Sequence, residues 1–422
     1  MKRVLLVATT TGYQTRMFAD AADRLGVELI YATDRCDQLD DPWRDGAIAV
    51  RYHEEAWSAE AVVAALQRRP IDGILVVGDR PTVLAALVAR ALGLPGNSPA
   101  AALAARDKRL ARECFRADGL LGPSCFTVPA STNPESLLQR LWFPVVLKPT
   151  VLSGSRGVIR ASDRESFVEA FQRLQRLLAS TEVRELRDDE SNIIQIESYI
   201  PGVEYAVESL LHHGELQVLA IFDKPDPLEG PFFEETIYVT PSRASAHTQK
   251  AIVNAVRAAA AALGLHHGPI HAECRVNVRG VYVLEVAARP IGGLCARALR
   301  FVNHEGDICG LEELLLRHAI GEPLGGWRFV PLGSAVMMVP IPKGGLYRSV
   351  HGLEAARAVR GVDDVRITAK ADQRLVPLPE GASYLGFIFA RAATPEAAEN
   401  AVRLSHEQLR FEIDPVIEVL QR

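Results

Sequence analysis

Two acids and one arginine in the segment from Ile270 to Arg297 have residue types and a spacing that suit a metal ion and a phosphate. Glu273 and Glu285 each lie in a short strand-like run, and Gly280 suits the left-handed position that closes a three-residue hairpin loop. In that register Glu273 lies across from Glu285, and because side chains alternate along a strand, Arg289 points the same way. Facing carboxylates suit a hard divalent cation and arginine suits phosphate, although an acid pair on a hairpin is more often solvated.

A lysine and a loop of small residues upstream suit phosphate binding. Lys148 lies near the end of the apolar run that begins at Phe143, and the loop after it contains Ser153, Gly154, Ser155 and Gly157. Glycines let backbone N–H groups approach phosphate oxygens, and a lysine supplies a point charge. The loop is not a Walker loop, because GxxxxGK[ST] is absent, and a two-glycine hairpin turn is the alternative.

Two further features are weak when taken alone. Lys108 is expected in the middle of a helix that Ser98 caps, where a lone lysine is normally solvated. A strand from Asn192 to Tyr199 ends at a sharp turn, and extended backbone there offers groups that can pair with an adenine, with Glu204 placed to bond a ribose. From residue types alone, an ordinary strand-turn-strand is the preferred interpretation of this second feature.

Length and composition bound the class of protein. The 422 residues predict two to four domains, and 48% hydrophobic with 23% charged residues is ordinary for a globular protein. A net charge of −5 argues against non-specific nucleic-acid binding. The six cysteines, Cys36 among them, are scattered without a CxxC, which predicts reduced thiols in the cytoplasm. The apolar run at the start is too short for a signal peptide, and no apolar run is long enough to span a membrane.

The elements that must position these residues begin with a strand-helix alternation over residues 1–97, which predicts a parallel sheet covered by helices. The strands are expected at Val4–Ala8, Val27–Ala32, Ala47–Arg51 and Gly73–Gly78, and the helices at Thr15–Leu25, Ser58–Arg69 and Pro81–Leu92. The first strand runs into Thr9 to Gly12, which lacks the GxGxxG of a dinucleotide site, so NAD is not expected.

The remaining chain predicts further domains. Helices are expected at Asp163–Ala179, Ala244–Leu263, Cys295–Phe301 and Leu311–Ile320, with a hairpin around His213-Gly214 and a charged connection from Thr181 to Glu190. The last segment holds strands and a helix, Pro395–Leu409, which is typical of a small α+β domain. The predicted division is 1–97, 98–200, 201–330 and 331–422.

Taken together and in this order, five motifs resemble the ATP-grasp superfamily, and the resemblance covers most of the chain. They are Lys108, Lys148, the SGSRGV loop, ESYIPGVE and Glu273…Glu285-x-x-x-Arg289. The resemblance implies an N-terminal α/β domain, a two-lobed ATP-grasp core and a small C-terminal α+β domain. No single motif is specific, whereas their order and spacing are.

The resemblance also implies a role for each motif, with ATP and Mg²⁺ (or Mn²⁺) as cofactors. Lys108 and Lys148 would contact the phosphates, with the loop from Ser153 to Gly157 closing over them. The adenine would be framed by Glu197, Tyr199 and Ile200, and the ribose by Glu204. Glu273 and Glu285 would hold the metal. Arg289 and the Gly292-Gly293 turn would face the reacting phosphate, and the turn would open a helix whose amides suit an anion.

Within the superfamily, the chain looks similar to carboxylate-amine ligases of the L-amino acid (dipeptide) ligase type. The similar stretches are DKP with GPFFE after it, and the ARPIGG turn; Lys224, Glu234 and Glu235 would be substrate-side charges, or else a solvated loop. This implies small carboxylate and amine substrates and an acyl phosphate formed with ATP, with neither nucleic acid nor membrane as a partner and a homodimer left open. The alternatives are a thioester-forming or carboxylating ATP-grasp enzyme and a non-catalytic nucleotide sensor.

One departure from the family pattern concerns the metal. The pattern reads Glu-x-Asn-x-Arg, whereas Ala287 stands here at the asparagine position, so the usual third metal ligand is missing. Water can replace it, because Mg²⁺ keeps several waters. His271 lies opposite Ala287 in the register above, and we hypothesise that it lines the vacancy; a packed or solvated histidine is the alternative.

Overall fold

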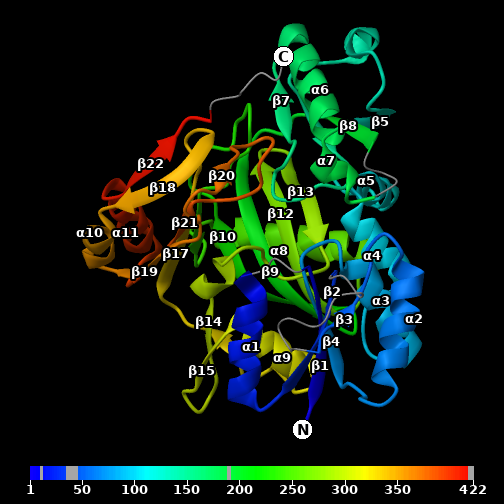
Figure 1. Cartoon of the computed structure of the whole chain (residues 1–422), viewed down its shortest axis with the longest axis vertical. Coiled ribbons are helices and arrows are strands. Elements are labelled where there is room, and N and C mark those ends of the chain that lie inside the picture. The colour runs from blue at the N-terminus through cyan, green and yellow to red at the C-terminus, as the bar shows by residue number, and fades with distance from the viewer. Residues whose placement is uncertain (10–12, 35–45, 188–191, 417–422) are drawn as a thin grey trace. The chain divides into compact units, whose positions relative to one another are not determined.

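The computed structural model of the chain describes residues 1–9, 13–34, 46–187 and 192–416 (Figure 1). The chain forms two compact units, and each unit is assembled from three separate stretches. Unit 1 comprises Met1–Gly122, Tyr205–Ile221 and Ala244–Val330, and unit 2 comprises Pro123–Glu204, Phe222–Arg243 and Pro331–Arg422. The predicted division into four domains stays a prediction. Cys36, residues 10–12 and residues 188–190 lie outside the described residues.

Unit 1 begins with the predicted parallel sheet, in the strand order β3-β2-β1-β4. Its elements are β1 (Arg3–Ala8), α1 (Tyr13–Leu25), β2 (Glu28–Thr33), β3 (Ile48–Ala49), α2 (Glu55–Leu66), β4 (Gly73–Val77) and α3 (Thr82–Leu92). Figure 1 shows α1 on one side of the sheet and α2 with α3 on the other. The neighbouring residues Leu5 and Leu6 of β1 point to opposite faces and are both fully buried, which is what coverage on both faces requires.

The helix predicted around Lys108 is two helices, α4 (Pro99–Arg106) and α5 (Lys108–Ala117). Ser98 caps α4 with Pro99 in its first turn, as expected. Asp107 breaks the helix because its backbone is extended and its side chain accepts hydrogen bonds from the N–H groups of Arg109 and Leu110. Lys108 therefore lies at the start of a helix and not in its middle.

The rest of unit 1 surrounds one apolar core. The strands β9 (Val203–His212) and β10 (Glu215–Asp223), which also contribute residues to unit 2, lie beside β12 (Gly268–Asn277) and β13 (Gly280–Ala287) in the order β13-β12-β9-β10. Helix α8 (Ala246–Ala262), capped by Ser245, packs Ile252 and Val256 into the core that these strands share with α4 and α5. The predicted hairpin at His213-Gly214 and the helix predicted at Ala244–Leu263 are both confirmed.

One predicted helix of unit 1 is wrong. Cys295–Ala298 is a single 3-10 turn, η3, and β14 (Arg300–Val302) follows it and pairs with β15 (Ile308–Gly310) and β16 (Arg328–Phe329). Leu299 is extended between them, because Phe301 must enter the strand that faces Cys309. Helix α9 (Leu311–Ala319) then forms as predicted.

Unit 2 contains a four-stranded sheet in the order β5-β8-β6-β7, with helix α6 over it. Its elements are β5 (Cys125–Pro129), η1 (Pro134–Arg140), β6 (Val145–Pro149), β7 (Ile159–Ala161), α6 (Arg164–Leu178), α7 (Thr181–Arg184) and β8 (Ile193–Ser198). Asp163 and Ser166 form a capping box that starts α6, and Phe167 and Phe171 one turn apart bury its inner face. The charged connection holds the short helix α7 where a loop was expected.

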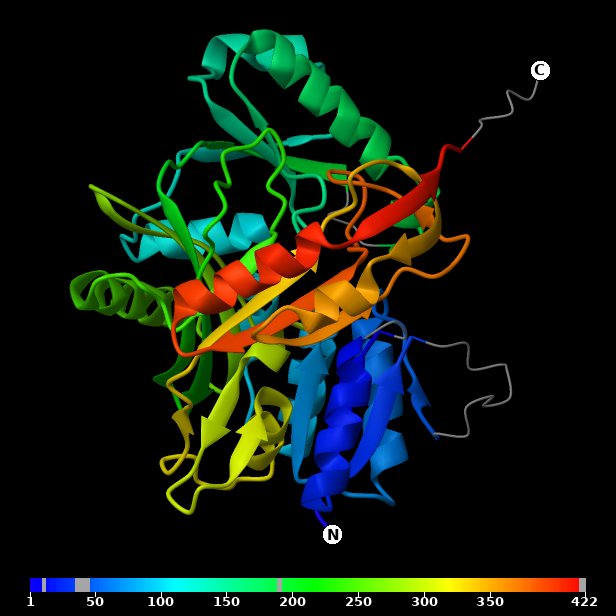
Figure 2. The same cartoon turned by 90° about the vertical axis from the view of Figure 1, so that its left-hand side faces the viewer.

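The C-terminal part of unit 2 has the predicted α+β composition. Its elements are β17 (Gly333–Val339), β18 (Gly345–His351), α10 (Leu353–Ala358), β19 (Val362–Ile367), β20 (Arg374–Leu375), β21 (Gly386–Ala392), α11 (Pro395–Glu407) and β22 (Arg410–Asp414). The strand β11 (Ile237–Thr240), from the middle stretch of unit 2, pairs with β17. The strands β11-β17-β21-β19 lie in that order, and Figure 2 shows α11, in red, lying along the yellow and orange strands β17 and β21. The three strands β18, β20 and β22 form a separate small sheet.

Candidate functional site

The acid pair lies on neighbouring strands of one hairpin in unit 1. Strands β12 and β13 pair antiparallel, with Glu273 opposite Glu285 and His271 opposite Ala287, which confirms the predicted register at these positions. Both carboxylates are half-buried, so neither is a fully solvated surface acid. Two carboxylates held across a strand pair are a suitable ligand set for a hard divalent cation.

The predicted hairpin loop is wrong, yet the register at the acids is right. Asn277 pairs with Gly280, which leaves a turn of two residues where three were expected. A β-bulge then leaves Leu284 unpaired and shifts the register by one residue before the acids. Gly280 has a φ of 133°, the positive value for which a glycine was expected there. The shorter turn and the bulge each shift the register by one residue in opposite directions, so Glu273 still lies opposite Glu285.

A buried carboxylate that sequence analysis missed holds His271. Nδ1 of His271 lies 3.1 Å from Oε2 of Glu208, and its Nε2 lies 3.7 Å from Oε1 of Glu273. Burial alone would lower the pKa of His271, but the hydrogen bond with Glu208 and the nearby carboxylate of Glu273 outweigh it and raise the pKa to about 9. Glu208 is fully buried, and that burial raises its own pKa. His271 is thus packed and paired, and its proposed contact with a metal stays a hypothesis.

Arg289 is bound by a second acid that sequence analysis missed, Asp79. Its Nε and Nη2 donate to the two carboxylate oxygens of Asp79 over 2.9 and 3.1 Å, which is the bidentate geometry. Burial alone would raise the pKa of Asp79, but Arg289 lowers it and Lys108 adds to that effect. Glu285 also acts electrostatically on Arg289, so unit 1 brings Lys108, Arg289 and the acid pair of the hairpin into one charged cluster. Their shared role stays a prediction.

The turn after Arg289 is held by hydrogen bonds with Glu208 and Gln14. The backbone N–H of Ile291 donates to both carboxylate oxygens of Glu208 over 3.2 Å, and the side-chain amide of Gln14 donates to the carbonyl of Ile291. Gly292 and Gly293 follow, exposed, with Gly293 at a φ of 62°. Because only the 3-10 turn η3 follows, the expected anion site at a helix N-terminus is wrong; such a turn has few aligned peptide dipoles.

In unit 2, Lys148 and Glu197 form a buried ion pair on adjacent strands. Nζ of Lys148 lies 2.7 Å from Oε2 of Glu197, and Nε2 of Gln195 donates to Oε1 of Glu197 over 2.6 Å. The register of β6 and β8 explains the contact, because Lys148 lies directly opposite Gln195. The side-chain oxygen of Gln195 is buried and accepts no hydrogen bond from any described residue, so it is available to a donor group of a ligand.

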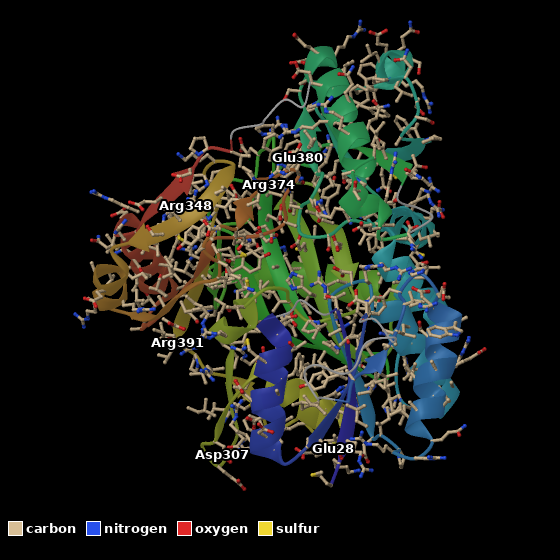
Figure 3. All side chains as sticks on the ribbon, in the orientation of Figure 1. Glu28, Asp307, Arg348, Arg374, Glu380 and Arg391 are labelled. Carbon is tan, nitrogen blue, oxygen red and sulfur yellow. The ribbon has the colours of Figure 1, made fainter. Side chains whose placement is uncertain are left out.

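The small-residue loop forms tight turns with left-handed backbone at three residues, and the N–H group of Gly157 donates to the carbonyl of Pro379 over 2.8 Å. Gly154, Ser155 and Gly157 all have positive φ, at 65°, 56° and 74°. A Cβ at Gly157 would lie 2.8 Å from Cγ of Pro149, so only glycine fits there. Arg156 between them donates to the carbonyl of Glu380, a residue labelled in Figure 3, over 2.7 Å.

The remaining predicted residues of unit 2 are largely buried. The guanidinium of Arg160 covers the ring of Tyr199 at 4.2 Å, and Ile200 is buried. Lys224 is bonded to Glu204 at 2.8 Å and to Glu235, so the solvated-loop alternative for Lys224 is wrong. Burial raises the pKa of Glu234. None of these observations tests the assigned roles, which stay proposals.

The lysine of β6 gives the first prediction. Lys148→Met keeps the buried stem and removes the charge, so we expect ATP to bind roughly tenfold to a hundredfold more weakly, since bonds to charged groups contribute about 1.5 to 3 kcal/mol. Calorimetric titration with ATP measures the change. Lys250→Met, at an exposed position of α8, is the control. Equal ATP affinities for Lys148→Met and wild type, with both folded by circular dichroism, would count against a phosphate role.

Three regions of the chain match domain families. Residues 19–96 match the ATP-grasp N-terminal domain, residues 141–298 the ATP-grasp domain, and residues 337–414 the L-amino acid ligase C-terminal domain 2. Together with the charged cluster and the glycine loop, these matches show that the chain is an ATP-grasp protein, which confirms the predicted fold class.

The relatives narrow this class. The crystal structure of L-amino acid ligase from Bacillus licheniformis superposes with a TM-score of 0.81 and 25% identity, covering 98% of this chain and 99% of that one. Alanine–anticapsin ligase of Bacillus subtilis (strain 168) is 31% identical over 215 residues, 48% of this chain and 44% of that protein. Carnosine synthase 1 of Gallus gallus is 30% identical over 249 residues, 57% of this chain and 27% of that protein. The chain thus resembles L-amino acid ligases, and its matches span less than half the length of these two curated relatives.

Two general properties complete the site description. Cys114, Cys125, Cys274, Cys295 and Cys309 are free thiols. Among the described helices, none combines the length and the apolar character that crossing a bilayer demands.

Proposed function

We propose that the chain is an ATP-dependent carboxylate-amine ligase that forms an amide bond of the dipeptide kind from an amino acid or a related carboxylate. The observation that carries the proposal is the half-buried pair Glu273 and Glu285 in one cluster with Arg289 and Lys108. The likeness to an L-amino acid ligase over nearly the whole chain supports it. The curated ligase and synthase relatives point the same way.

The proposed reaction has two steps. A carboxylate oxygen of the first substrate attacks the γ-phosphorus of ATP, the bond from phosphorus to ADP breaks, and an acyl phosphate forms. An amine nitrogen of the second substrate then attacks the acyl carbon, the carbon–oxygen bond to phosphate breaks, and the amine gives up a proton to solvent. Phosphoryl transfer needs mainly positioning and charge neutralisation, so no nucleophilic side chain is required.

The proposed roles in unit 2 concern the nucleotide. Lys148 and the loop from Ser153 to Gly157 would bind phosphates, and Glu197 with Tyr199 and Ile200 would frame the adenine. The unpartnered oxygen of Gln195 supports an adenine there. The ribose would be bound by Glu204, and the substrate-side charges would be Lys224, Glu234 and Glu235.

The proposed roles in unit 1 concern charge. Glu273 and Glu285 would hold Mg²⁺ or Mn²⁺, which when bound neutralises phosphate charge; the donor set fits, since both ligands are oxygens. Ala287 supplies no ligand, so water would fill that position. Arg289 and Lys108 would stabilise negative charge on the transferred phosphoryl group, and Asp79 holds the guanidinium in place for this.

A phosphate-release screen tests the proposal. We expect ATP hydrolysis to depend on a pair of amino acids, and hydroxylamine to trap the acyl phosphate when the carboxylate substrate is present without an amine. Release of phosphate that depends on bicarbonate or coenzyme A would favour the carboxylating or thioester-forming alternative. ATP binding without any amino-acid-dependent turnover would favour the nucleotide sensor. A cytoplasmic location and a homodimer stay predictions.

A further inference from the structure

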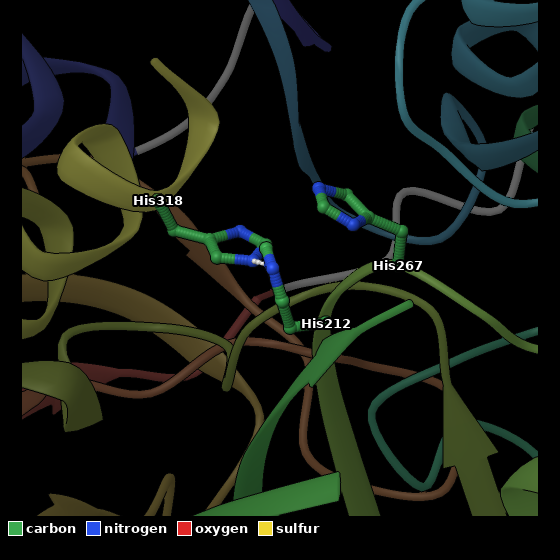
Figure 4. Close-up of side chains that lie close together, drawn as sticks. All are labelled: His212, His267 and His318. Carbon is green, nitrogen blue, oxygen red and sulfur yellow. Dashed lines mark hydrogen bonds between the residues drawn. The ribbon is translucent and has the colours of Figure 1, made fainter. Parts of the chain in front are cut away.

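Unit 1 gathers histidines from three segments at a place that the ligase chemistry does not use. His212 ends β9, His267 lies in the loop between α8 and β12, and His318 lies in the last turn of α9. Each residue offers one ring nitrogen, and these three nitrogens all lie within 4.8 Å of one another. Figure 4 shows the three side chains, here called the histidine cluster: a hydrogen bond joins His212 and His318, and His267 lies beside them on a separate segment.

The spacing of two of these rings matches a shared metal ion. Nδ1 of His212 lies 3.2 Å from Nε2 of His318. Two imidazole nitrogens bound to one tetrahedral Zn²⁺ at the usual bond length lie about 3.3 Å apart. A hydrogen bond between His212 and His318 explains the same distance, but it does not explain why the ring of His267 lies beside them.

His267 supplies the observation that a hydrogen bond between the other two rings does not explain. Its Nδ1 is buried and has no hydrogen-bond partner among the described residues. A buried ring nitrogen without a partner is unfavourable by about 1 to 3 kcal/mol, so this nitrogen is available to a ligand. The rings of His267 and His318 stack with centroids 4.4 Å apart, so at least one of them must turn before both can direct a nitrogen at one ion.

The ring type also suits a metal ion. A neutral imidazole offers one nitrogen lone pair for a ligand bond, so three rings supply three of the four ligands of a tetrahedral ion.

The backbone around the cluster is held in place by hydrogen bonds. Oδ1 of Asn97 accepts from the N–H groups of His266 and His267 over 2.7 and 3.1 Å, and Gly214 donates to the carbonyl of His266 over 2.7 Å. The loop that carries His267 is thus tied to the β9–β10 turn beside His212. His318 sits on a helix. Such support is typical of a preorganised ligand set.

We propose that the histidine cluster binds one divalent transition-metal ion, with Zn²⁺ as the best match, and that the ion clamps β9, the 266–267 loop and α9 together. Three imidazoles without a carboxylate favour a borderline metal over Mg²⁺ or Ca²⁺, which prefer oxygen ligands. His212 is exposed, so solvent reaches the site and a water can complete the coordination. The proposal does not depend on the ligase function.

Metal titration of tag-free protein tests the proposal. Protein stripped with a chelator is titrated with Zn²⁺ against a chromophoric competitor in excess Mg²⁺, and with Co²⁺ as a visible-absorption reporter of tetrahedral geometry. We expect one equivalent per chain and a rise in the unfolding temperature with Zn²⁺. The variants His212→Asn and His267→Asn should each weaken binding at least tenfold and abolish the temperature rise. Both change an exposed or loop residue, so they should fold.

His247→Asn, at an exposed position in the first turn of α8, is the matched control and should bind Zn²⁺ like wild type. The proposal is overturned if wild type binds Zn²⁺ no more tightly than the His212→Asn/His267→Asn double variant. It is equally overturned if the double variant still binds one equivalent of Zn²⁺ per chain, as wild type does. Activity of the ligase enters neither outcome.

Discussion

Glu285→Gln is expected to lower amino-acid-dependent ATP hydrolysis on the order of a hundredfold to a thousandfold, the loss found when one preorganised charge-stabilising group is removed. The amide keeps the size of the side chain on β13 but lacks the charge that a divalent cation requires. Phosphate release, measured as kcat and KM for ATP over a range of Mg²⁺ concentrations, gives the result. A higher Mg²⁺ requirement should accompany the loss.

Glu305→Gln is the control for this change, because Glu305 is an exposed acid of the same unit. It should leave both kcat and the Mg²⁺ requirement unchanged. Activity within twofold of wild type in Glu285→Gln would refute the metal assignment of the hairpin, and with it the main support for the proposed reaction. The unfolding temperature shows whether the variant keeps its fold.

Asp79→Ala is expected to lower the free energy of unfolding by about 3 kcal/mol, because it leaves the guanidinium of Arg289 largely buried without its bidentate partner. Adding Arg289→Met removes the orphaned charge, so the double variant should be more stable than the sum of the single effects implies. We expect a coupling of about 2 kcal/mol from urea denaturation of all four proteins in the cycle.

The exposed pair of Lys2 and Asp72 provides the comparison. Lys2→Ala should change stability by less than about 1 kcal/mol, as is usual for surface ion pairs. Strictly additive losses in the Asp79 and Arg289 cycle would contradict the structural role given to the pair. Catalytic loss in Asp79→Ala at unchanged ATP affinity would mark Asp79 as a positioning residue for Arg289.

The hairpin shows how far sequence reasoning reaches. Alternation and one glycine sufficed to place Glu273 opposite Glu285, because side-chain faces follow from strand period. They did not reveal the bulge at Leu284, since a bulge depends on twist and packing across the whole sheet. The correct register was therefore reached through a loop that is one residue too long.

Sequence analysis missed two acids that contact site residues but lie far from them along the chain. Glu208 is the one charged residue in the mostly apolar run from Tyr205 to Leu211 of β9, and Asp79 follows the carboxyl end of β4, where parallel sheets place ligand-binding groups. Both signals were present in the sequence. Their partners His271 and Arg289 are 63 and 210 residues away along the chain, and no local pattern reports such contacts.

Asp107 shows a different limit of sequence analysis: its preference for a helix N-cap was visible in the sequence but was given too little weight. An aspartate before Lys108 is a good N-cap, but the alanine-rich run before it favours an unbroken helix. Only the extended backbone at Asp107 decides between the two, and it moves Lys108 to the first turn of α5, at the start of the helix.

The interleaving of the two units along the chain has a consequence for synthesis on the ribosome. The apolar core of unit 1 joins Ala101 in α4 to Val286 in β13, with residues of unit 2 encoded between them. At elongation rates of about 5 to 20 residues per second, α4 waits roughly 10 to 40 seconds for those strands to emerge. During that interval the part of its apolar face that packs against β13 is uncovered, so nascent chains of this protein are natural clients for chaperones that cover exposed hydrophobic surface.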